Sequence, residues 1–380
     1  MVPVMKRLAI LGSTGSIGRQ TLEVVRAFPD RLQVVALACG DNVSLIREQI
    51  AEFNPSLVFT NVEDVSCLSG GTQHLSLEEI ASHPDVDMVV VATAGKAGLG
   101  VTLAAIRAGK KVALANKEVL VMAGKLITTE AKTNGVDLYP IDSEHSAIWQ
   151  CLTGEDKEEI SKLILTASGG PFRLKTEEQL DAVTPEEALK HPTWQMGVKV
   201  TIDSATLMNK GMELIEARWL FDVPLSRIEV VIHPQSIVHS VVEFIDGSSK
   251  AQLSMPDMRL PIQYALTYPD RWESPYRQEI DLGKIGLLQF EPVELNRYPC
   301  LRLAMLAGEK GGTYPAVMSA ADEVAIEMFL SKRIRFTDIS GLVAQTLDQH
   351  VAINEPSLEE IIAADAWARE TAMASIGVAE

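Results

Sequence analysis

The stretch KRLAILGSTGSIGRQTLEVV, residues 6–25, carries the clearest structural signal in this chain. A short apolar run typical of a strand (6–11) leads into the glycine turn GSTGSIG (12–18), and apolar residues then recur at helical spacing. Glycines let a backbone approach a pyrophosphate, while the next helix offers free N–H groups at its N-terminus. Such a turn also serves plain strand–helix packing, but its place directly after the first strand favours a nucleotide site. Hydroxyl donors would come from Ser13, Thr14 and Ser16.

Strand and helix patterns alternate onward from this turn. Apolar runs predict strands at 32–39, 57–59, 87–92 and 111–114, and helical periodicity predicts helices at 45–53 and 98–108. Repeated strand–helix units form a parallel sheet with helices on both faces. The sequence therefore predicts an α/β fold with an N-terminal Rossmann-like, doubly wound parallel sheet, whose loops 93–95 and 115–118 face a cofactor.

The choice between NAD and NADP stays open at this point. An NAD enzyme usually has an acidic residue at the end of the second strand, whereas an NADP enzyme places a cation nearby. Here Cys39 and Gly40 occupy that end, Asp41 follows, and Arg47 is a candidate cation.

Length and composition bound the class of protein. A chain of 380 residues predicts two or three domains, and 47% hydrophobic with 22% charged residues is typical of a globular protein. The 34 Lys and Arg against 51 Asp and Glu give a net charge of −17, which disfavours nucleic acid as a partner. No apolar run reaches the roughly 18 residues of a membrane helix, and four widely spaced cysteines are typical of a reducing compartment. We expect a cytoplasmic protein without disulfides or structural zinc.

Two carboxylates follow a predicted strand at 136–139. In an extended chain Asp142 and Glu144 point to the same side, where they could share Mg²⁺ or Mn²⁺, cations that prefer oxygen ligands. The alternative is an ordinary helix start, with Asp142 or Ser143 as the N-cap.

A second cluster is TASGGPFR at 166–173, after a predicted strand at 162–165. The backbone N–H groups and the Ser168 hydroxyl could form an anion nest, to which Arg173 could add charge. A simple turn would have the same sequence.

A third cluster follows a predicted strand at 198–202. On a helix from about Ser204, the side chains of Asn209 and Glu213 lie four residues apart on one face, beside Lys210. An amide, an ammonium and a carboxylate could together hold a phosphorylated substrate and a metal ion. The alternative is a solvated helix face on which Glu213 pairs with Lys210.

The loop between these clusters holds two large apolar side chains, Trp194 and Met196, among Pro and Gly. It could be a lid that excludes water or a loop that its aromatic residue fixes to the core. His191 could cap a turn, and we expect His233 and His239 to be structural.

Taken together, these strings resemble one family, 1-deoxy-D-xylulose 5-phosphate reductoisomerase of the methylerythritol phosphate route to isoprenoids. Six motifs in the first two thirds of the chain carry the resemblance: LGSTGSIG (11–18), ALANKE (113–118), PIDSEH (140–145), SGGPFR (168–173), HPTWQMG (191–197) and IDSATLMNKGMELIEA (202–217). The rest of the chain also looks similar, so we take the resemblance as full length.

The resemblance implies roles for individual residues. Metal ligands would be Asp142, Glu144 and Glu213, with Lys117 joining them in catalysis. Substrate contacts would come from Lys117, Ser143, Glu144, Ser168, His191, Trp194, Met196, Ser204, Asn209, Lys210 and Glu213. NADPH contacts would come from Thr14, Gly15, Ser16, Ile17, Gly40, Asp41, Asn42, Asn116, Glu118 and Gly197. Family members often carry a cation at the place of Asp41, so the sequence leaves the neutralisation of the 2′-phosphate open.

The implied activity is a metal-dependent rearrangement followed by NADPH reduction, which gives 2-C-methyl-D-erythritol 4-phosphate. The metal would be Mg²⁺ or Mn²⁺, with Co²⁺ as a third candidate, and the protein would be a homodimer with its interface around 228–253. The domains would be an NADPH-binding domain (1–142), a catalytic and dimerisation domain (143–267), a linker (268–294) and a helical C-terminal domain (295–380). Two alternatives are an NAD(P)-dependent dehydrogenase of the homoserine dehydrogenase type and a non-catalytic dinucleotide sensor.

Overall fold

The computed structural model describes residues 5–62, 72–190, 194 and 196–377. Its residues pack into two compact units, each with its own hydrophobic core. The first unit comprises Met1–Val119, Lys125–Trp149 and Asp257–Glu279. The second comprises Leu120–Gly124, Gln150–Pro256 and Ile280–Glu380. The functional domain boundaries at 142, 267 and 294 stay a prediction, because packing units and functional domains need not coincide.

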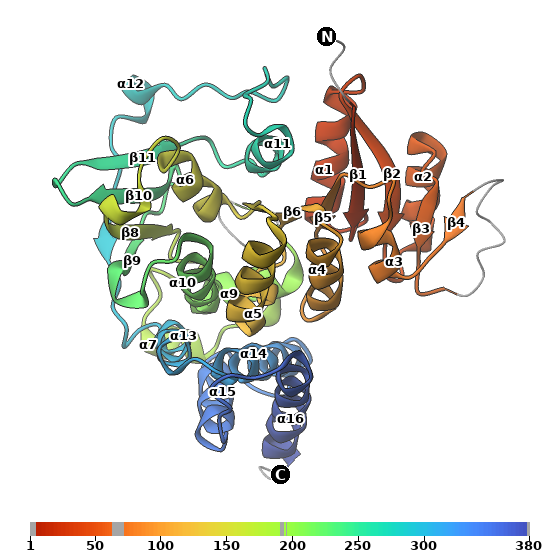
Figure 1. The fold of residues 1–380 in the computed structure, drawn as a ribbon. Helices are drawn as coiled ribbons and strands as arrows, with labels where there is room; N and C mark the ends of the chain where they lie inside the picture. The colour runs from red at the N-terminus through yellow and green to blue at the C-terminus, as the bar shows by residue number, and fades with distance from the viewer. Residues whose placement is uncertain (1–4, 63–71, 191–193, 195, 378–380) are drawn as a thin grey trace. The chain divides into compact units, whose positions relative to one another are not determined.

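The first unit is built on a seven-stranded sheet in the order β4-β3-β2-β1-β5-β6-β7, with every neighbouring pair parallel (Figure 1). The predicted doubly wound α/β fold is confirmed. Its strands are β1 (Lys6–Leu11), β2 (Leu32–Ala38), β3 (Leu57–Phe59), β4 (Gln73–His74), β5 (Met88–Val91), β6 (Lys111–Leu114) and β7 (Leu138–Pro140). The helices along this part of the chain are α1 (Ser16–Ala27), α2 (Val43–Phe53), α3 (Leu77–Ser82), α4 (Ala97–Arg107), α5 (Glu118–Asn134), α6 (Ser143–Cys151) and α11 (Arg259–Thr267).

The strand order indicates at which end of this sheet a ligand would bind. The chain runs outward from β1 through β2 and β3 to β4, then returns to the other side of β1 at β5. Ligands of open parallel sheets bind at the carboxyl ends of the strands where the order reverses. The loops after β1 and β5 are therefore the expected nucleotide loops.

A returning segment, 257–279, completes the first unit. The Trp272 ring packs edge-on against Phe28 at 5.1 Å between centroids, and Tyr264 meets Trp149 at 4.6 Å. Aromatic pairs at these separations stabilise a core beyond the area they bury. The first part of the proline-bearing stretch at 268–294 thus belongs to the sheet unit through its aromatic residues.

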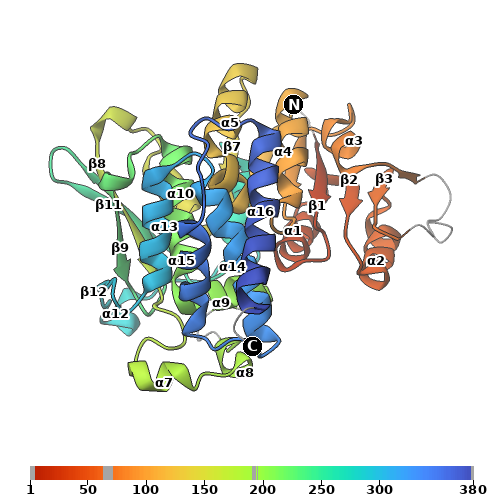
Figure 2. The same cartoon turned by 90° about the horizontal axis from the view of Figure 1, so that it is seen from below.

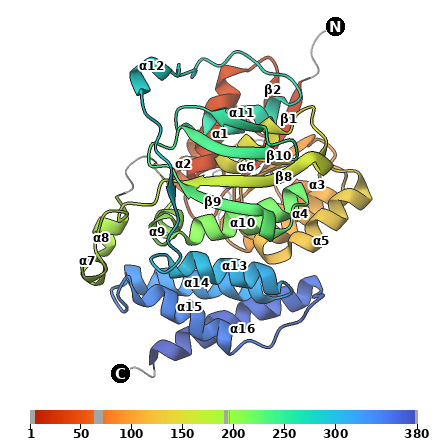
Figure 3. The same ribbon diagram turned by 90° about the vertical axis from the view of Figure 1, so that its left-hand side faces the viewer.

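The second unit has a five-stranded sheet in the order β11-β10-β8-β9-β12, with α10 and then α13 stacked beyond it (Figure 3). The pair β8 and β9 is parallel and the other pairs are antiparallel. The strands are β8 (Ile160–Ala167), β9 (Ile228–Ile232), β10 (Val238–Phe244), β11 (Ser249–Leu253) and β12 (Glu291–Pro292). The helices are η1 (Lys157–Glu159), α7 (Glu177–Asp181), α8 (Pro185–Ala188), α9 (Val198–Thr206), α10 (Met208–Phe221), η2 (Leu225–Arg227), α12 (Leu282–Ile285), α13 (Pro299–Lys310), α14 (Tyr314–Leu330), α15 (Asp338–Asp348) and α16 (Leu358–Gly377).

One predicted strand is wrong. Residues 198–202 begin the helix α9, which Gly197 caps at its N-terminus. The alternation of Val198, Val200 and Ile202 imitates a strand, but burial falls on Thr201, Ile202 and Ala205, at helical spacing. Tertiary packing thus overrides the β-propensity of valine and isoleucine.

The predicted helix from about Ser204 is two helices. Leu207 adopts a left-handed conformation with φ of 58°, which ends α9 at Thr206 and lets α10 begin at Met208. Leucine rarely adopts this conformation, so no residue pattern indicated the break.

Helices α13, α14, α15 and α16 lie side by side in the part of the chain predicted as a helical C-terminal domain (Figure 2). The first two of these helices, α13 and α14, start alike. Both begin with proline in the first turn, where its missing N–H costs nothing. Within the described ranges, no helix has the length and apolar character needed to cross a membrane.

Candidate active site

The glycine turn after β1 is sterically closed to side chains at two positions. Gly12 has φ of +93°, and a Cβ there would lie 2.4 Å from the Ala92 carbonyl oxygen in the loop after β5. A Cβ on Gly18 would lie 2.2 Å from the Gly12 oxygen. Gly15 caps α1 and is exposed, with Thr14 and Ser16 half-buried beside it. The backbone N–H groups at the N-terminus of α1 therefore have few side chains around them. A pyrophosphate requires such a close approach to the backbone.

The hydroxyl of Ser13 is not available to a ligand, contrary to the prediction. It is buried and donates to Gln49 Oε1 at 2.7 Å, while Gln49 Nε2 donates to the Ser13 carbonyl oxygen at 2.9 Å. This pair ties the turn to α2. The sequence analysis missed Gln49, and a polar residue at a buried helix position was the only available signal.

Asn116 joins the two neighbouring loops at the same sheet edge. Its Nδ2 donates to the carbonyl oxygens of Thr93 and Gly95, each at 2.8 Å, and its Oδ1 accepts from the Val119 N–H at 3.2 Å. The predicted cofactor loops after β5 and β6 thus form one hydrogen-bonded structure. Glu118 begins α5 from a buried position beside them.

The loop after β2 is polar and open. Asn42 caps α2 by accepting from the Leu45 N–H at 3.2 Å, and exposed Asp41 accepts from Asn61 Nδ2 at 3.2 Å. Arg47 is exposed on α2. Burial, followed by the charge of Asp41, raises the pKa of the Cys39 thiol to about 11, so it stays protonated at neutral pH.

Lys117 and Asp142 form an ion pair at the carboxyl ends of β6 and β7. Lys117 Nζ lies 2.7 Å from Asp142 Oδ2, with side chains only 10% and 15% exposed. His145 Nδ1 approaches the same oxygen at 4.0 Å. Partial desolvation strengthens such a pair, so both charged groups are held in fixed positions for a ligand.

The extended-chain argument for Asp142 and Glu144 is wrong, and the alternative of a helix start is correct. The Ser146 N–H donates to the Asp142 carbonyl oxygen at 2.8 Å, so α6 begins at Ser143 and places Glu144 in its first turn. The Ser143 hydroxyl donates to Glu144 Oε2 at 2.6 Å. A helix start and a pair of oxygen ligands are compatible, because the first turn favours carboxylates.

In the second unit, the SGGPFR loop packs onto the end of α9. Gly169 and Gly170 have φ of +84° and +71°, and a Cβ on Gly170 would lie 2.7 Å from the Ser204 carbonyl oxygen. The Gly170 N–H donates to Ser168 Oγ at 3.2 Å. The fold thus joins the segments of two predicted phosphate contacts, Ser168 and Ser204, both half-buried.

Arg173 does not supply free charge to this loop. Its Nη1 pairs with Glu291 at 2.9 Å, which ties the loop to β12.

The third cluster is buried rather than a solvated helix face. On α10, Asn209 Nδ2 and Lys210 Nζ both donate to the Glu213 carboxylate. Lys210 and Glu213 are 4% and 1% exposed. Burying a charged pair away from water costs free energy, and such pairs gather at functional sites, so this pair marks a candidate site.

The predicted lid lies partly inside the described residues. Trp194 is half-buried, with its ring 6.3 Å from that of His239, and Met196 is half-buried next to Gly197. His191 lies outside the described residues. The structural role of His233 is confirmed, because its Nε2 accepts from the N–H groups of Ile237 and Val238, each at 3.1 Å, and its Nδ1 donates to a carbonyl oxygen.

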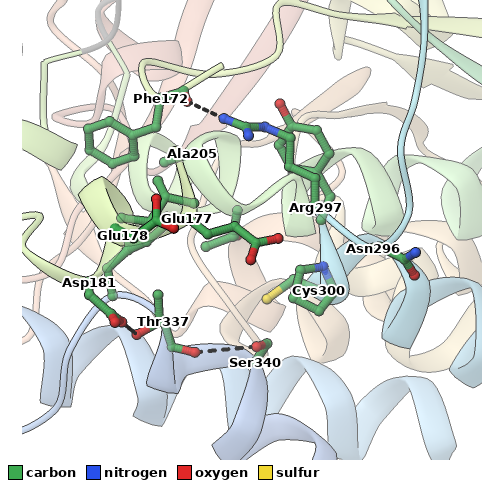
Figure 4. Close-up of a pocket in the computed structure, with 15 residues that line it drawn as sticks. Phe172, Glu177, Glu178, Asp181, Ala205, Asn296, Arg297, Cys300, Thr337 and Ser340 are labelled. Carbon is green, nitrogen blue, oxygen red and sulfur yellow. Dashed lines mark hydrogen bonds between the residues drawn. The ribbon is translucent and has the colours of Figure 1, made fainter. Parts of the chain in front are cut away.

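A cavity of about 450 Å³ in the second unit is separate from these residues (Figure 4). Its walls include Phe172, Ala205 and Thr206, together with Arg297 and Cys300. None of the predicted phosphate contacts among the described residues lines it. Figure 4 shows the Arg297 side chain donating to the Phe172 carbonyl oxygen, a bond of 2.8 Å. The guanidinium group of Arg297 therefore stabilises the SGGPFR loop.

The parallel sheet, the bare glycine turn at its switch point and the linked loops beside it define a nucleotide-binding oxidoreductase fold. Three family models, all of 1-deoxy-D-xylulose 5-phosphate reductoisomerase domains, match residues 8–124, 138–221 and 253–371. The chain belongs to the 1-deoxy-D-xylulose 5-phosphate reductoisomerase family, and the predicted resemblance is confirmed.

The similarity extends over whole chains. The reductoisomerases of Pelotomaculum thermopropionicum and Heliobacterium modesticaldum are each 53% identical to this chain, over 96% and 98% of it and 97% and 98% of their own lengths. A crystal structure of a reductoisomerase with NADPH, fosmidomycin and magnesium matches with a TM-score of 0.92 and 43% identity, covering 98% of this chain and 99% of the other. The Zymomonas mobilis enzyme with NADPH matches at 0.91 and 42%, with the same coverage.

Proposed function

We propose that this protein converts 1-deoxy-D-xylulose 5-phosphate to 2-C-methyl-D-erythritol 4-phosphate, with NADPH and a divalent metal ion, in isoprenoid precursor biosynthesis. The observation that carries the proposal is the full-length match to a relative solved with NADPH, fosmidomycin and magnesium. Family membership also removes the homoserine dehydrogenase alternative. The non-catalytic sensor alternative requires a lost site, whereas every proposed catalytic side chain is present.

NADPH fits the first unit. The pyrophosphate would lie on the turn at 12–18, where glycine leaves room and the α1 N-terminus attracts negative charge. Loops at the ends of β2, β5 and β6 would contact the rest of the cofactor. The proposed contacts are Thr14, Gly15, Ser16, Ile17, Gly40, Asp41, Asn42, Asn116 and Glu118, with Gly197 from the α9 cap.

A hard divalent cation fits the chemistry of the proposed ligands Asp142, Glu144 and Glu213, which are all carboxylates. Asp142 is fixed by Lys117, and Glu213 is fixed by Asn209 and Lys210. Held carboxylates need little reorganisation to bind Mg²⁺ or Mn²⁺, and Co²⁺ is a third candidate. When bound, the ion would polarise the substrate oxygens, and NADPH would supply the hydride.

The residues of the chain bind and orient the substrate. Ser168, Ser204, Asn209, Lys210 and His191 would hold the phosphate through hydroxyl, amide and cationic donors. Lys117 Nζ and Ser143 Oγ would donate to the reacting end of the sugar. Trp194 and Met196 would cover the site and exclude water.

We further infer a homodimer, with an interface near β9, β10 and β11, and a cytoplasmic location. The exposed face of β11 supports the first inference, and the wide spacing of the cysteines, typical of reduced proteins, supports the second. Sedimentation equilibrium tests the dimer, because a monomer at micromolar concentration would contradict it.

The experiment that tests the function is NADPH oxidation at 340 nm with 1-deoxy-D-xylulose 5-phosphate. We expect turnover with Mg²⁺ or Mn²⁺, none after chelation and full recovery when metal is returned. A parallel assay with NADH should be much slower. Folded protein that binds NADPH but does not turn over with any of the three metals would instead support the sensor.

A further inference from the structure

Three ionisable side chains meet in the interior of the second unit, outside the proposed active site. Lys199 and Asp203 lie one turn apart on α9, and Asp322 lies on α14. Lys199 Nζ is 2.7 Å from Asp203 Oδ2 and 3.5 Å from Asp322 Oδ2. Asp203 is 1% exposed and Asp322 is fully buried. One ammonium therefore faces two buried carboxyl groups.

This arrangement requires a proton. Asp203 Oδ1 and both oxygens of Asp322 have no donor at hydrogen-bonding geometry among the described residues. Both carboxyl groups approach the same Lys199 ammonium, so they are neighbours, and a hydrogen bond between them forms only when one of them is protonated. Because Lys199 Nζ is farther from Asp322 than from Asp203, Asp322 is the carboxyl group that carries the proton.

The surroundings of Asp322 agree with this assignment. Burial first, and the charge of Asp203 second, raise the pKa of Asp322 well above its usual range, whereas Lys199 has a smaller, opposite effect. From α13, the Cys300 thiol faces the same carboxyl group, and its own pKa is also raised well above its usual range, chiefly by burial.

Two charged groups on the other helices packed against α14 have partners of their own. From α16, Arg369 pairs with Asp365 and with Glu323. At the start of α15, Asp338 pairs with Arg335.

The cluster is connected directly to the proposed substrate site. Ser204, the proposed phosphate contact, is next to Asp203 in sequence, and its carbonyl oxygen packs against Gly170 in the SGGPFR loop. The same helix begins at Gly197, immediately after the proposed lid. A bond that holds Asp203 to α14 therefore fixes the helix that carries Ser204.

We propose that Asp322 is a positioning residue for this reaction: as a neutral acid it donates a hydrogen bond to Asp203 and so holds α9, with Ser204, in the geometry that binds substrate phosphate. The proposal rests on the proposed function. The amide of D322N can donate the same bond at every pH, whereas the side chain of D322L has a similar branched shape but cannot donate.

The test compares Asp322→Asn with Asp322→Leu, using Asp365→Asn as a matched control for a buried aspartate in the same helical layer. With substrate and metal, we expect D322N to keep the KM for 1-deoxy-D-xylulose 5-phosphate within about twofold of the unsubstituted protein. D322L should raise that KM about tenfold, the ratio one charge-assisted hydrogen bond supplies, with a smaller change in kcat. The KM for NADPH should not change in either variant, and the control should leave both constants unchanged.

Thermal unfolding between pH 5 and pH 9 gives an independent readout. The folded protein keeps a proton that the unfolded chain loses above about pH 4, so the contribution of Asp322 to stability falls as pH rises toward its folded pKa. D322N lacks this loss, so its melting temperature relative to the unsubstituted protein should increase with pH.

Three results would overturn the proposal. They are equal KM defects in D322N and D322L, a D322L variant that is folded with normal KM, or a stability difference for D322N that does not grow with pH. If the unsubstituted protein does not turn over, the proposed function fails separately, and calorimetric binding of the sugar phosphate then replaces KM in the same comparison.

Discussion

The glycine turn at 12–18 and the α10 cluster of Asn209, Lys210 and Glu213, both proposed ligand sites, are built in opposite ways. The turn works through its backbone, with exposed Gly15 at a helix N-terminus and side chains excluded by contacts as short as 2.2 Å. The α10 cluster works through charged side chains, nearly all of whose surface is buried. The glycine turn depends on missing side chains, whereas the α10 cluster depends on an ion pair that is buried away from water.

This difference predicts which kind of substitution disrupts each site. A backbone site fails when volume is added, because its donors are fixed by the fold itself. A buried ionic site fails when one charge is removed, because the partner is left uncompensated. Substitutions at the two places should therefore separate cofactor binding from turnover.

The largest effect is expected for Glu213→Gln. Loss of one carboxylate from the proposed metal set should lower kcat by about a thousandfold, since a preorganised charge in a dry site supplies about that factor. NADPH binding, followed by fluorescence titration, should be unchanged. Glu323→Gln, which removes a carboxylate paired with Arg369 in the same unit, should leave kcat unchanged. Equal loss of NADPH binding and turnover would contradict the role of Glu213.

The next effect is expected for Gly12→Ala. The new methyl group would lie 2.4 Å from the Ala92 oxygen at a left-handed backbone position, so the clash should cost about 3 kcal/mol beyond the backbone strain. We expect the affinity for NADPH to fall by about a hundredfold, because about 3 kcal/mol corresponds to two factors of ten at about 1.4 kcal/mol each.

The matched control is Gly109→Ala, which has φ of +69° and no neighbouring atom within 4 Å of the new methyl group. It isolates the backbone strain, about 1 kcal/mol. Similar melting temperatures for the two variants would show that the close approach to Ala92 is not what requires glycine at position 12.

The sheet unit could be predicted well from the sequence, for a definite physical reason. Parallel strands buried on both faces read as continuous apolar runs, so 6–11, 57–59 and 111–114 match β1, β3 and β6 residue for residue. The glycine turn was found because its steric requirement is local. The Ser13–Gln49 pair could not be found, because it joins residues 36 positions apart.

The substrate segment was harder because its chemistry depends on tertiary packing. The β-branched residues of 198–202 favour a strand locally, and only their neighbours in the fold make them a helix. The sequence placed Asn209, Lys210 and Glu213 on one face correctly, but the burial of Lys210 and Glu213 depends on the tertiary fold and could not be predicted. The role proposed for Asp322 had no sequence signal, since Lys199 and Asp203 lie more than a hundred residues away from it.

A smaller effect is expected for Trp194→Ala, which distinguishes a lid from a loop fixed to the core. A lid residue should lower turnover about tenfold, the value of one aromatic contact with the substrate complex, and change the melting temperature little. A core-fixing residue should instead cost about 3 kcal/mol of stability. Thermal unfolding measured beside steady-state kinetics separates the two, and an unfolded variant would reject the lid.

The smallest effect is expected for Asp41→Ser, which tests whether side-chain charge matters at the backbone site. Exposed Asp41 follows β2, where the 2′-phosphate of NADPH would lie, so removing its charge should tighten NADPH about threefold and leave NADH unchanged. Asp30→Ser makes the same charge change in the exposed loop before β2, at the opposite end of the strand, and should change neither affinity. If both variants tighten NADPH equally, the effect comes from net charge and not from position 41. If neither does, the backbone alone determines cofactor binding, and the contrast with α10 becomes sharper still.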